Sequence, residues 1–444
     1  MKKTASIFFV IFFSFALQAQ EVQLNNLTLN EAITYSLQHS PLHNIQKMKL
    51  EEARLQLEEA KLTHIPTVYA SGDVRNNLII PSTPVPAIIL DPDASPDETI
   101  YMKFNTKWNA TAGLNLSYDL FNPEKMGRVA EQKQQLKILE YDAQLSENDL
   151  RAKVAMAYAE CVIAQEQLFA LAADTAYYTR ALLQAEDLYA KEKIALTEKN
   201  NAQTALNESL MRYLQGEKIL SDTKSNLLYV MGEELSPENI RALRVTESIN
   251  ELYEKMERTF SPDAAAHLSE LRQNQVIALA GERVRFAALK YAPTVTLNGY
   301  YGTNFYNNEF KLFNSDLWRG NSYIGLSLKV PITQALSTSK EVSRLRMQET
   351  IERENLRDIL QTREKDRWNE FSLLEVNRKN FRLSLENLEM SRQNLHAAGV
   401  QLEKGYILEK DFMEEQLKMQ NARQNYMQAA FDVFSSYVAI EKLK

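Results

Sequence analysis

Histidine and cysteine, the side chains most indicative of catalytic and metal sites, are few in this chain and are scattered. Only five histidines and one cysteine occur among its 444 residues. His39 and His43 stand four positions apart, so a helix would place them on one face, yet no HExxH-like pattern surrounds them. We interpret both as surface residues. The other histidines, His64, His267 and His396, lie far apart in the sequence.

The remaining reactive groups lead to the same interpretation. Cys161 is the only cysteine, so no disulfide can form within one chain, and its helical surroundings predict a small buried residue. The sequence contains no glycine-rich phosphate loop and no plausible catalytic triad. The formal net charge of −7 argues against nucleic acid as a partner. We therefore predict that the protein is not an enzyme and holds neither a cofactor nor a metal.

The N-terminal residues have the composition of an export signal. Lys2 and Lys3 precede an apolar run at 7–17 that is rich in phenylalanine, and Ala19 follows it. A run of about 11 residues is too short to cross a bilayer as a helix, so we interpret 1–20 as a secretory signal peptide. No later stretch approaches the roughly 20 apolar residues of a spanning helix. The mature chain is thus expected in the periplasm, outside the cell or in the outer membrane.

Two stretches of the chain are predicted to form very long helices. No proline occurs between Pro123 and Pro237 or after Pro331, and both stretches are rich in strong helix formers. Each contains one short interruption, so we expect helical hairpins at 124–230 and 334–443. Helices far longer than the globular mean of about 11–12 residues indicate coiled-coil packing.

The chain contains an internal repeat, because similar segments precede the two helical hairpins. HIPTVYASGDV resembles YAPTVTLNGYY, and TAGLNLSYDLF resembles YIGLSLKVPIT. The hairpin turn near Lys193 corresponds to the turn at Gly405, at an offset of about 212 residues. We therefore expect a first repeat at 21–235 and a second repeat at 236–444.

Polar and apolar residues alternate in the segments before the hairpins, which predicts β-strands. We expect them at about 66–78, 106–120, 293–306 and 321–332. Strands of this length with one apolar face suit a lipid-facing barrel, whereas half-buried strands of a soluble sheet are the alternative. The export signal favours the barrel. So do aromatic residues that could form girdles at the membrane interfaces: Tyr69, Trp108, Tyr118, Tyr306, Trp318 and Tyr323.

Four strands cannot close a barrel, because the smallest membrane barrels have about eight strands. Open strand edges cannot face lipid, where each unpaired backbone group costs several kcal/mol. The chain must therefore share a barrel with other copies, and two or three copies would satisfy this requirement. The proline-rich loop at 78–104 is longer than its counterpart at 307–320, which is typical of the extracellular side. The first long helix, at 124–190, would reach about 100 Å.

At this point the sequence resembles a known family, the TolC-type outer-membrane efflux proteins. The resemblance rests on LTLNEAITYSLQHSP at 27–41, on GLSLKVPI at the second strand-to-helix junction, and on EKGYILEKDFMEEQLKMQNARQNYMQA at 403–429. The same order of segments occurs twice, so the resemblance extends over the whole mature chain. No single motif is specific, but the duplicated order is.

The resemblance implies an α+β membrane protein that acts as a homotrimer in the outer membrane and extends into the periplasm. Each protomer would give four transmembrane β-strands to a shared 12-stranded β-barrel, and long antiparallel coiled-coil helices would form a periplasmic α-barrel. Such proteins are passive exit ducts of tripartite efflux or secretion systems. The implied partners are outer-membrane lipid, a periplasmic adaptor protein, and an inner-membrane pump of the RND or ABC type.

The resemblance also assigns roles to individual residues. Counting six and nine positions from Gly405, it places the pore constriction at Asp411 and Glu414, which would share a helix face. In a trimer they would form two acidic rings that favour cations. Without the resemblance, both would be read as a solvated helix face. The residues implied to contact the adaptor are the hairpin tips: Ile194, Ala195, Leu196, Thr197, Gly405, Tyr406, Ile407 and Leu408.

The first repeat departs from this pattern. Lys193 occupies the place expected for the turn glycine, and Lys199 the place where an acidic residue is common. A pair between Lys199 and Asp411 is one arrangement that would hold the entrance closed. The alternative function is a structural coiled-coil protein of the periplasm or outer membrane that does not conduct. A general uptake porin is a second alternative, but it needs more strands and less helix.

Overall fold

The computed structural model describes residues 24–259 and 267–442, apart from 91, 94, 96 and 98. The expected signal peptide, 1–20, lies outside the described residues. The chain forms two compact units, and each takes segments from both halves of the sequence. The sheet unit contains Lys47–Ala143 and Leu268–Thr362. The core unit contains the chain up to Gln46, Gln144–His267, and the chain from Arg363 onward.

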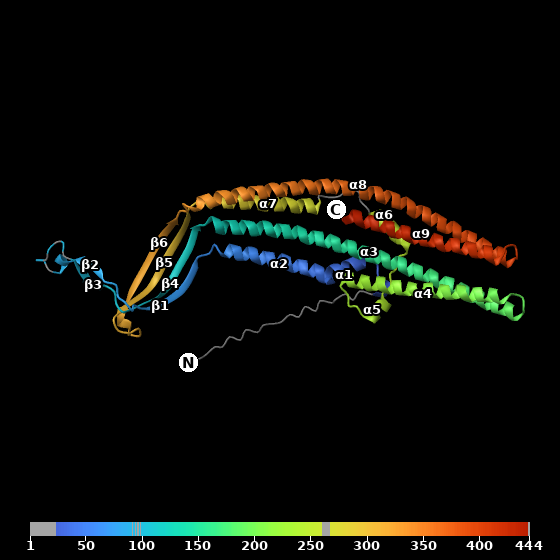
Figure 1. The fold of residues 1–444 in the computed structure, drawn as a ribbon, viewed down its shortest axis with the longest axis horizontal. Helices are drawn as coiled ribbons and strands as arrows, with labels where there is room; N and C mark the ends of the chain where they lie inside the picture. The colour runs from blue at the N-terminus through green and yellow to red at the C-terminus, as the bar shows by residue number, and fades with distance from the viewer. Residues whose placement is uncertain are drawn as a thin grey trace, which may run out of the picture. The chain divides into compact units, whose positions relative to one another are not determined.

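One order of elements occurs twice along the chain: a helix, two paired strands and two long helices (Figure 1). In the first half these are α2 (Pro41–Leu62), β1 (Thr67–Asn76), β4 (Trp108–Phe121), α3 (Pro123–Ala190) and α4 (Leu196–Met231). In the second half they are α7 (Leu268–Leu289), β5 (Thr294–Asn307), β6 (Trp318–Lys329), α8 (Gln334–Glu403) and α9 (Glu409–Lys442). The predicted combination of paired strands and long antiparallel helices is confirmed.

Shorter elements complete the fold. They are the 3-10 turns η1 (Leu24–Asn26), η2 (Ala87–Ile89) and η3 (Ser315–Leu317), the helices α1 (Leu29–His39), α5 (Pro237–Ala242) and α6 (Ile249–Thr259), and the strands β2 (Thr83–Pro86) and β3 (Thr99–Met102). The strands β2 and β3 form a small hairpin within the segment expected to be a loop. Proline in β2 removes backbone donors, which is tolerated because this strand pairs on one side only.

Local sequence signals define where the long helices begin and end. The Asn122 side chain accepts hydrogen bonds from the backbone N–H groups of Glu124 (3.1 Å) and Lys125 (3.3 Å), and Pro123 occupies the first turn of α3. Helix α4 ends at Gly232, whose φ of 80° lies in the left-handed region. The first helical pair therefore ends where the glycine predicted it.

The four long strands form one antiparallel sheet in the order β1-β4-β5-β6, seen side by side in Figure 1. The predicted strand ranges agree with the structure within a few residues. The largest difference is in β6, which begins at Trp318, directly after η3, and ends at Lys329. Pro331 follows closely, and proline cannot continue the ladder of a strand paired by its N–H groups.

The main hydrophobic core lies in the core unit, where α6 packs against α8 and α9. The Tyr253 and Phe381 rings stack with centroids 4.5 Å apart, and Phe381 and Tyr426 stack at 5.4 Å. Phe434 and Cys161 are fully buried in the same cluster. The prediction for Cys161 is therefore confirmed.

The structure shows the surroundings of the two histidines that were interpreted as surface residues, His39 and His43. His43 is buried in the core unit, so its assignment to the surface was wrong. His39 stacks on Tyr35, with ring centroids 3.9 Å apart, and its Nδ1 lies 3.0 Å from the Tyr35 carbonyl oxygen. Helix α1 ends at His39 and α2 begins at Pro41, so the two histidines belong to different helices and the expected shared helix face does not form. Among the described residues, no helix has the length and apolar composition to cross a membrane.

Candidate functional site

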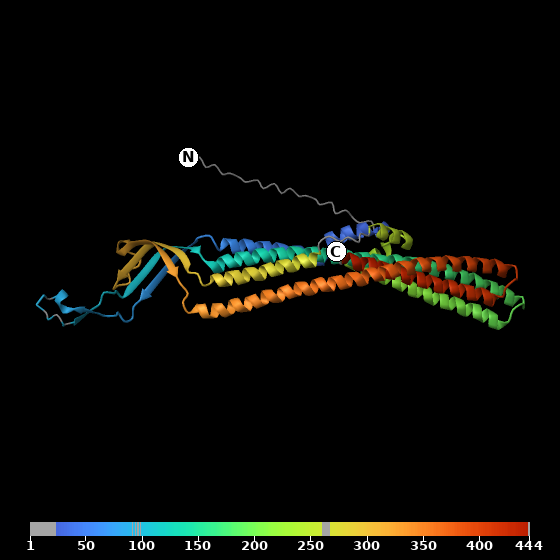
Figure 2. The same cartoon turned by 90° about the horizontal axis from the view of Figure 1, so that it is seen from above.

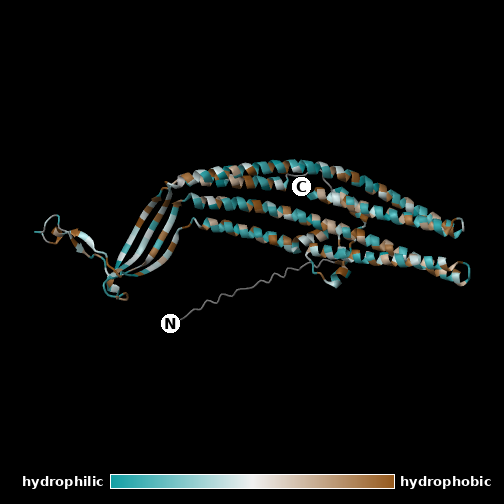
Figure 3. Ribbon diagram, in the orientation of Figure 1, coloured by the Kyte–Doolittle hydropathy of each residue, from teal (hydrophilic) through white to brown (hydrophobic). Residues whose placement is uncertain are grey.

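Hydrophobic and hydrophilic residues follow one another along the long strands (Figure 3), and the strand register gives the sheet one apolar and one polar face, as the alternation predicted. The register places Leu116 opposite Val68 and Gly299, and Leu297 opposite Leu326. Directly opposite residues project from the same face, so the apolar sets of all four strands form one surface. This surface is open in the protomer, since Val68, Leu326 and Leu328 are exposed.

Hydrogen-bonding side chains cover the opposite face of the sheet. The Asn115 Nδ2 donates to Ser71 Oγ over 2.7 Å, and the Asn298 Nδ2 donates to Ser327 Oγ over 2.8 Å. These amide and hydroxyl groups pair across strands and keep this face hydrated. A sheet with these two faces can separate lipid from water.

Tyrosines form a row across the middle of the polar face. Tyr69 is opposite Asn115, Asn115 is opposite Tyr300, and Tyr300 is opposite Tyr323. The rings of Tyr300 and Tyr323 are stacked, with centroids 5.9 Å apart and planes inclined by 23°. We call Tyr69, Tyr300 and Tyr323 the tyrosine row. The strand register, and not a local sequence pattern, brings these rings to one level of the sheet.

The expected aromatic girdles are only partly supported by the side-chain directions. Trp318 aligns with Phe305, which is opposite Ala110, and Tyr118 is opposite Leu297, so Trp318 and Tyr118 belong to the apolar face. Trp108, at the start of β4, lies two residues before Ala110 and therefore projects from the same face. Its ring contacts the Phe310 ring, with centroids 4.6 Å apart.

Three members of the expected girdles were assigned wrongly. Tyr69, Tyr306 and Tyr323 lie on the polar face, because Tyr306 is opposite Asn109 and the other two belong to the tyrosine row. Position near a strand end does not determine which face a side chain occupies. The alternation of side chains along the strand determines it.

Both helical hairpins turn through the same backbone geometry, at one end of the core unit (Figures 1 and 2). Glu192 has a φ of 54° and Gly405 a φ of 72°. In the first turn, the Glu192 N–H donates to Tyr189 O and the Lys193 N–H to Leu188 O, each over 2.9 Å. The second turn repeats this pattern from Gly405 and Tyr406, also at 2.9 Å.

The backbone pattern corrects the expected alignment of the two turns. The residue equivalent to Gly405 is Glu192 and not Lys193, because Glu192 is the one with positive φ. The residue equivalent to Asp411 is then Glu198, in the first turn of α4, and not Lys199. The first repeat therefore retains an acidic residue at this place. Sequence similarity near the turn was too weak to detect a shift of one residue.

Lys199 and Asp411 each interact within their own hairpin. The Lys199 Nζ lies over the Tyr189 ring, 5.5 Å from its centroid. The Asp411 Oδ2 accepts a hydrogen bond from the Leu408 N–H over 3.1 Å, so this carboxylate caps the start of α9. Glu414 is exposed on the same helix. Asp411 thus has a structural role as well as the role that the resemblance implies.

The hairpin tips are apolar and only partly covered. Ile194 and Ile407 occupy equivalent places and are half-buried, so they help to close the two turns. Leu196, Tyr406 and Leu408 are exposed, with Tyr406 at 77% and Leu408 at 72%. The other predicted tip residues, Ala195, Thr197 and Gly405, are exposed as well. Exposed apolar side chains at a turn are typical of an interaction site.

An ion pair and an aromatic contact join the two hairpins above their tips. Arg423 on α9 donates to Asp174 on α3 over 2.9 Å, and the side chains are 19% and 15% exposed. The Tyr177 ring contacts Phe412, with centroids 5.6 Å apart. A second ion pair between α9 and α3 joins Lys442 to Asp149 over 2.9 Å.

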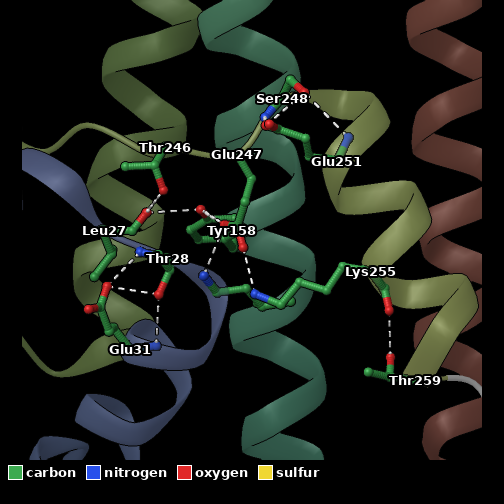
Figure 4. Close-up of polar contacts among 11 residues, drawn as sticks. Leu27, Thr28, Glu31, Tyr158, Thr246, Glu247, Ser248, Glu251, Lys255 and Thr259 are labelled. Atoms are coloured by element: carbon green, nitrogen blue, oxygen red, sulfur yellow. Dashed lines mark hydrogen bonds and ion pairs between the residues drawn. The ribbon is translucent and has the colours of Figure 1, made fainter.

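A polar junction in the core unit fastens the N-terminal segment to α3 (Figure 4). The Glu247 carboxylate accepts hydrogen bonds from Lys255 Nζ (2.6 Å) and the Leu29 N–H (3.1 Å), and it contacts the Tyr158 hydroxyl. The Tyr158 hydroxyl also lies 2.9 Å from the Leu27 carbonyl oxygen. This junction could not be found from the sequence, because it joins segments that lie far apart along the chain.

The described residues contain no arrangement suited to catalysis. No group of three or more His, Cys, Asp or Glu side chains in the described part of the chain could hold a metal ion. Burial raises the pKa of the Cys161 thiol to about 11, so it is not a nucleophile at neutral pH. Burial, aided by Glu247, also raises the pKa of the Tyr158 hydroxyl. These groups stabilise the fold.

Sequence comparisons agree with the geometry of the sheet and the hairpins. Residues 36–233 match the family model of the outer membrane efflux proteins. The outer membrane protein TolC of Vibrio cholerae serotype O1 is 27% identical over 234 residues, which cover 50% of this chain and 50% of that protein. The chain thus matches about half the length of this relative.

The fold is also found in solved structures of outer-membrane channels. The CmeC channel of Campylobacter jejuni superposes with a TM-score of 0.73 at 15% identity, over 94% of this chain and 85% of that one. The outer membrane protein VceC of Vibrio cholerae gives a TM-score of 0.69 at 16% identity, over 94% and 95%. At such identities the likeness shows the fold alone. Together with the match over residues 36–233, which is less than half of the chain, it makes the chain similar to the TolC-type outer membrane efflux proteins, whose place is the outer membrane with an extension into the periplasm.

Proposed function

We propose that this protein is the passive exit duct of a tripartite efflux or secretion system in the outer membrane. The observation that carries the proposal is a four-stranded sheet with one apolar and one polar face, whose strands lead into helices of 68 and 70 residues. A sheet of this kind suits the wall of a water-filled pore. The helices suit a conduit that continues from it.

The proposed duct is a homotrimer with a 12-stranded barrel. Among the described residues, β1 and β6 each pair with one strand only, so both outer edges of the sheet are open. An open edge in lipid leaves backbone N–H and C=O groups unsatisfied, at several kcal/mol each. Pairing β1 of one copy with β6 of the next removes both edges. The family supports three copies in preference to two.

The proposed partners bind at the hairpin tips. Leu196, Tyr406 and Leu408 give each protomer exposed apolar side chains at the end of the core unit. A periplasmic adaptor protein that covers them would link the duct to an inner-membrane pump of the RND or ABC type. The proposed entrance is lined by Asp411 and Glu414, and Glu198 supplies an acid at the equivalent place of the other hairpin.

Purified protein in detergent and in planar bilayers tests the proposal directly. We expect a trimer that requires detergent for extraction and gives discrete single-channel conductance. A trimer that inserts into bilayers without any conductance would favour the alternative, a structural coiled-coil protein. A monomer that remains in solution without detergent would contradict both the barrel and the duct.

A further inference from the structure

The tyrosine row lies at the centre of the polar face and is accessible there. Tyr69 and Tyr323 are 52% and 57% exposed, and Tyr300 is half-buried between them. Asn115, the fourth member of this row of the sheet, contributes an amide and no charge. Three aromatic rings at one level of four strands therefore face the side that the proposed barrel directs toward its lumen.

The residues beside Tyr300 in the next row are small, so its ring can lie close to the sheet while Tyr69 and Tyr323 stay exposed. The adjacent row of the polar face holds Gly113 opposite Gly302. A Cβ atom added to Gly113 would lie 2.9 Å from Tyr300 Cε2, and one added to Gly302 would lie 2.6 Å from the Tyr300 hydroxyl oxygen. The Tyr300 ring therefore lies across these two glycines, close to the sheet, where a larger side chain would displace it.

A purely structural role accounts for one of the three residues of the tyrosine row. Covering glycines with an aromatic ring stabilises a sheet, and this accounts for Tyr300. It does not account for Tyr69, which is on β1, or for Tyr323, which is on β6, since both are more than half exposed. Exposed tyrosines on a wall of Ser, Thr, Asn and Gly side chains provide a surface for binding.

We propose that the tyrosine row is a contact site for organic cations that carry aromatic or bulky apolar groups. The faces of tyrosine rings attract cations and stack with aromatic rings. The row itself carries no fixed charge. On the same face Arg75 lies 3.7 Å from Asp73, and Asp119 pairs with Lys125 of α3 at 2.8 Å. Arg319 and Lys329 also lie on this face, at the two ends of β6 and away from Tyr323. This inference rests on the proposed duct and specifies the class of molecule that its wall contacts.

Weak binding is what a conducting path requires. A passing molecule must be held briefly and then released, so a site of moderate affinity does not obstruct transport. Three copies would bring three tyrosine rows to the lumen. The acidic residues proposed for the entrance, Asp411 and Glu414, would favour the same charge class.

Single-channel recordings with two cations test the tyrosine row. Tetraphenylphosphonium carries four aromatic rings, whereas tetramethylammonium has the same charge without rings. In the wild-type duct we expect transient block by tetraphenylphosphonium at concentrations where tetramethylammonium has no effect. In Tyr69→Ser/Tyr323→Ser the duration of block should fall about fivefold, as expected from losing cation–π contacts at an exposed site. Tyr300 is left in place because it covers the two glycines.

Two further variants separate ring contact from loss of structure. Tyr69→Phe/Tyr323→Phe keeps the rings and should retain the block. Tyr301→Ser removes an exposed tyrosine from the adjacent position of β5, on the apolar face, and should leave the block unchanged. If the double serine variant forms no channels, Tyr69→Ser alone should still shorten the block. Equal block in wild type and in all serine variants would overturn the contact site but not the duct, whereas absence of conductance in wild type would refute the duct itself.

Discussion

At the scale of single residues, the two hairpin turns show how one backbone geometry tolerates different side chains. Gly405 adopts positive φ without steric cost, whereas Glu192 adopts it with a Cβ atom. The same hydrogen bonds form in both turns, so the backbone pattern is dictated by the ends of the helices. The glycine is visible in the sequence, but its glutamate equivalent is not, which is why the predicted first turn was displaced by one residue.

Glycine exchange at the two turns should therefore change stability in opposite directions. Glu192→Gly removes a side chain from the left-handed region and should raise the free energy of unfolding by about 1 kcal/mol. Gly405→Ala should lower it by a similar amount, about 1 kcal/mol. Thermal unfolding followed by circular dichroism in detergent measures both changes.

A glycine elsewhere in the fold provides the control for this pair. Gly281 lies inside α7, where an added Cβ meets no atom within 4 Å. Gly281→Ala should stabilise the protein by about 0.5–1 kcal/mol, because alanine favours helix more than glycine does. If Gly405→Ala were also stabilising, the backbone argument would be wrong.

The carboxyl group of Glu166, in the core unit, should make the free energy of unfolding depend on pH. Burial raises its pKa above the usual 4.5, although the hydrogen bond from the Ile249 N–H (2.7 Å) acts in the opposite direction. The folded state then binds a proton more tightly than the unfolded chain. The contribution of Glu166 to stability is therefore lost as pH rises from 4.5 through the raised pKa.

Glu166→Gln should remove this loss while keeping an oxygen that accepts from Ile249. The variant should unfold at a higher temperature than wild type near pH 8 and at a similar temperature at about pH 4. Glu31 is the matched control, since hydrogen bonds from Thr28 lower its pKa. Glu31→Gln should be slightly destabilising near pH 8 and neutral at low pH. A parallel response of both variants would exclude burial of Glu166 as the cause.

At the scale of elements, the strands and long helices were predictable, whereas the contacts between them were not. Alternation alone places Leu297 and Leu326 on apolar faces, because side chains on a strand have a period of two. The register between strands cannot be read from this alternation. Tyr69, Tyr300 and Tyr323 align through backbone pairing between segments far apart in the chain, and no local pattern encodes that pairing.

The same limit applies to the polar junction and to the tips. Glu247 is one glutamate among many in the sequence, and only the fold brings it to Tyr158. Asp411 and Glu414 were assigned by counting from a turn glycine, and the structure adds that Asp411 caps α9. The hairpin β2–β3 was missed because its strands are short and contain proline, which normally indicates a loop.

Neighbouring residues of β6 offer a matched test of the two faces. Leu326 lies on the apolar face opposite Leu297, and Ser327 lies on the polar face opposite Thr296. A lysine facing the middle of the bilayer costs about 2–4 kcal/mol, whereas a lysine in the lumen remains hydrated. Leu326→Lys should thus reduce the amount of heat-resistant oligomer in outer-membrane extracts, and Ser327→Lys should not. The reverse result would mean that the faces are assigned the wrong way round.

At the scale of the whole molecule, the protomer is an incomplete structure. Its sheet has two open edges, its apolar face is uncovered, and its tips expose apolar side chains. In the proposed duct each of these features has a neighbour: another copy at the edges, lipid at the apolar face, and an adaptor at the tips.

The charge of the proposed entrance is a property of the trimer and can be tested without disturbing the protomer. Replacing Asp411 by alanine would remove the cap of α9 together with the charge. Asp411→Asn with Glu414→Gln instead removes six negative charges from a trimer and keeps an oxygen for the Leu408 N–H. We expect a lower cation conductance at low salt, because the rings no longer concentrate cations, and a block by Mg²⁺ weakened about tenfold, since divalent cations would lose their carboxylate ligands. Glu409→Gln removes charge from the same turn but from another helix face, and it should change neither measurement. Unchanged Mg²⁺ block in the double variant would remove Asp411 and Glu414 from the entrance, leaving Asp411 with its capping role alone.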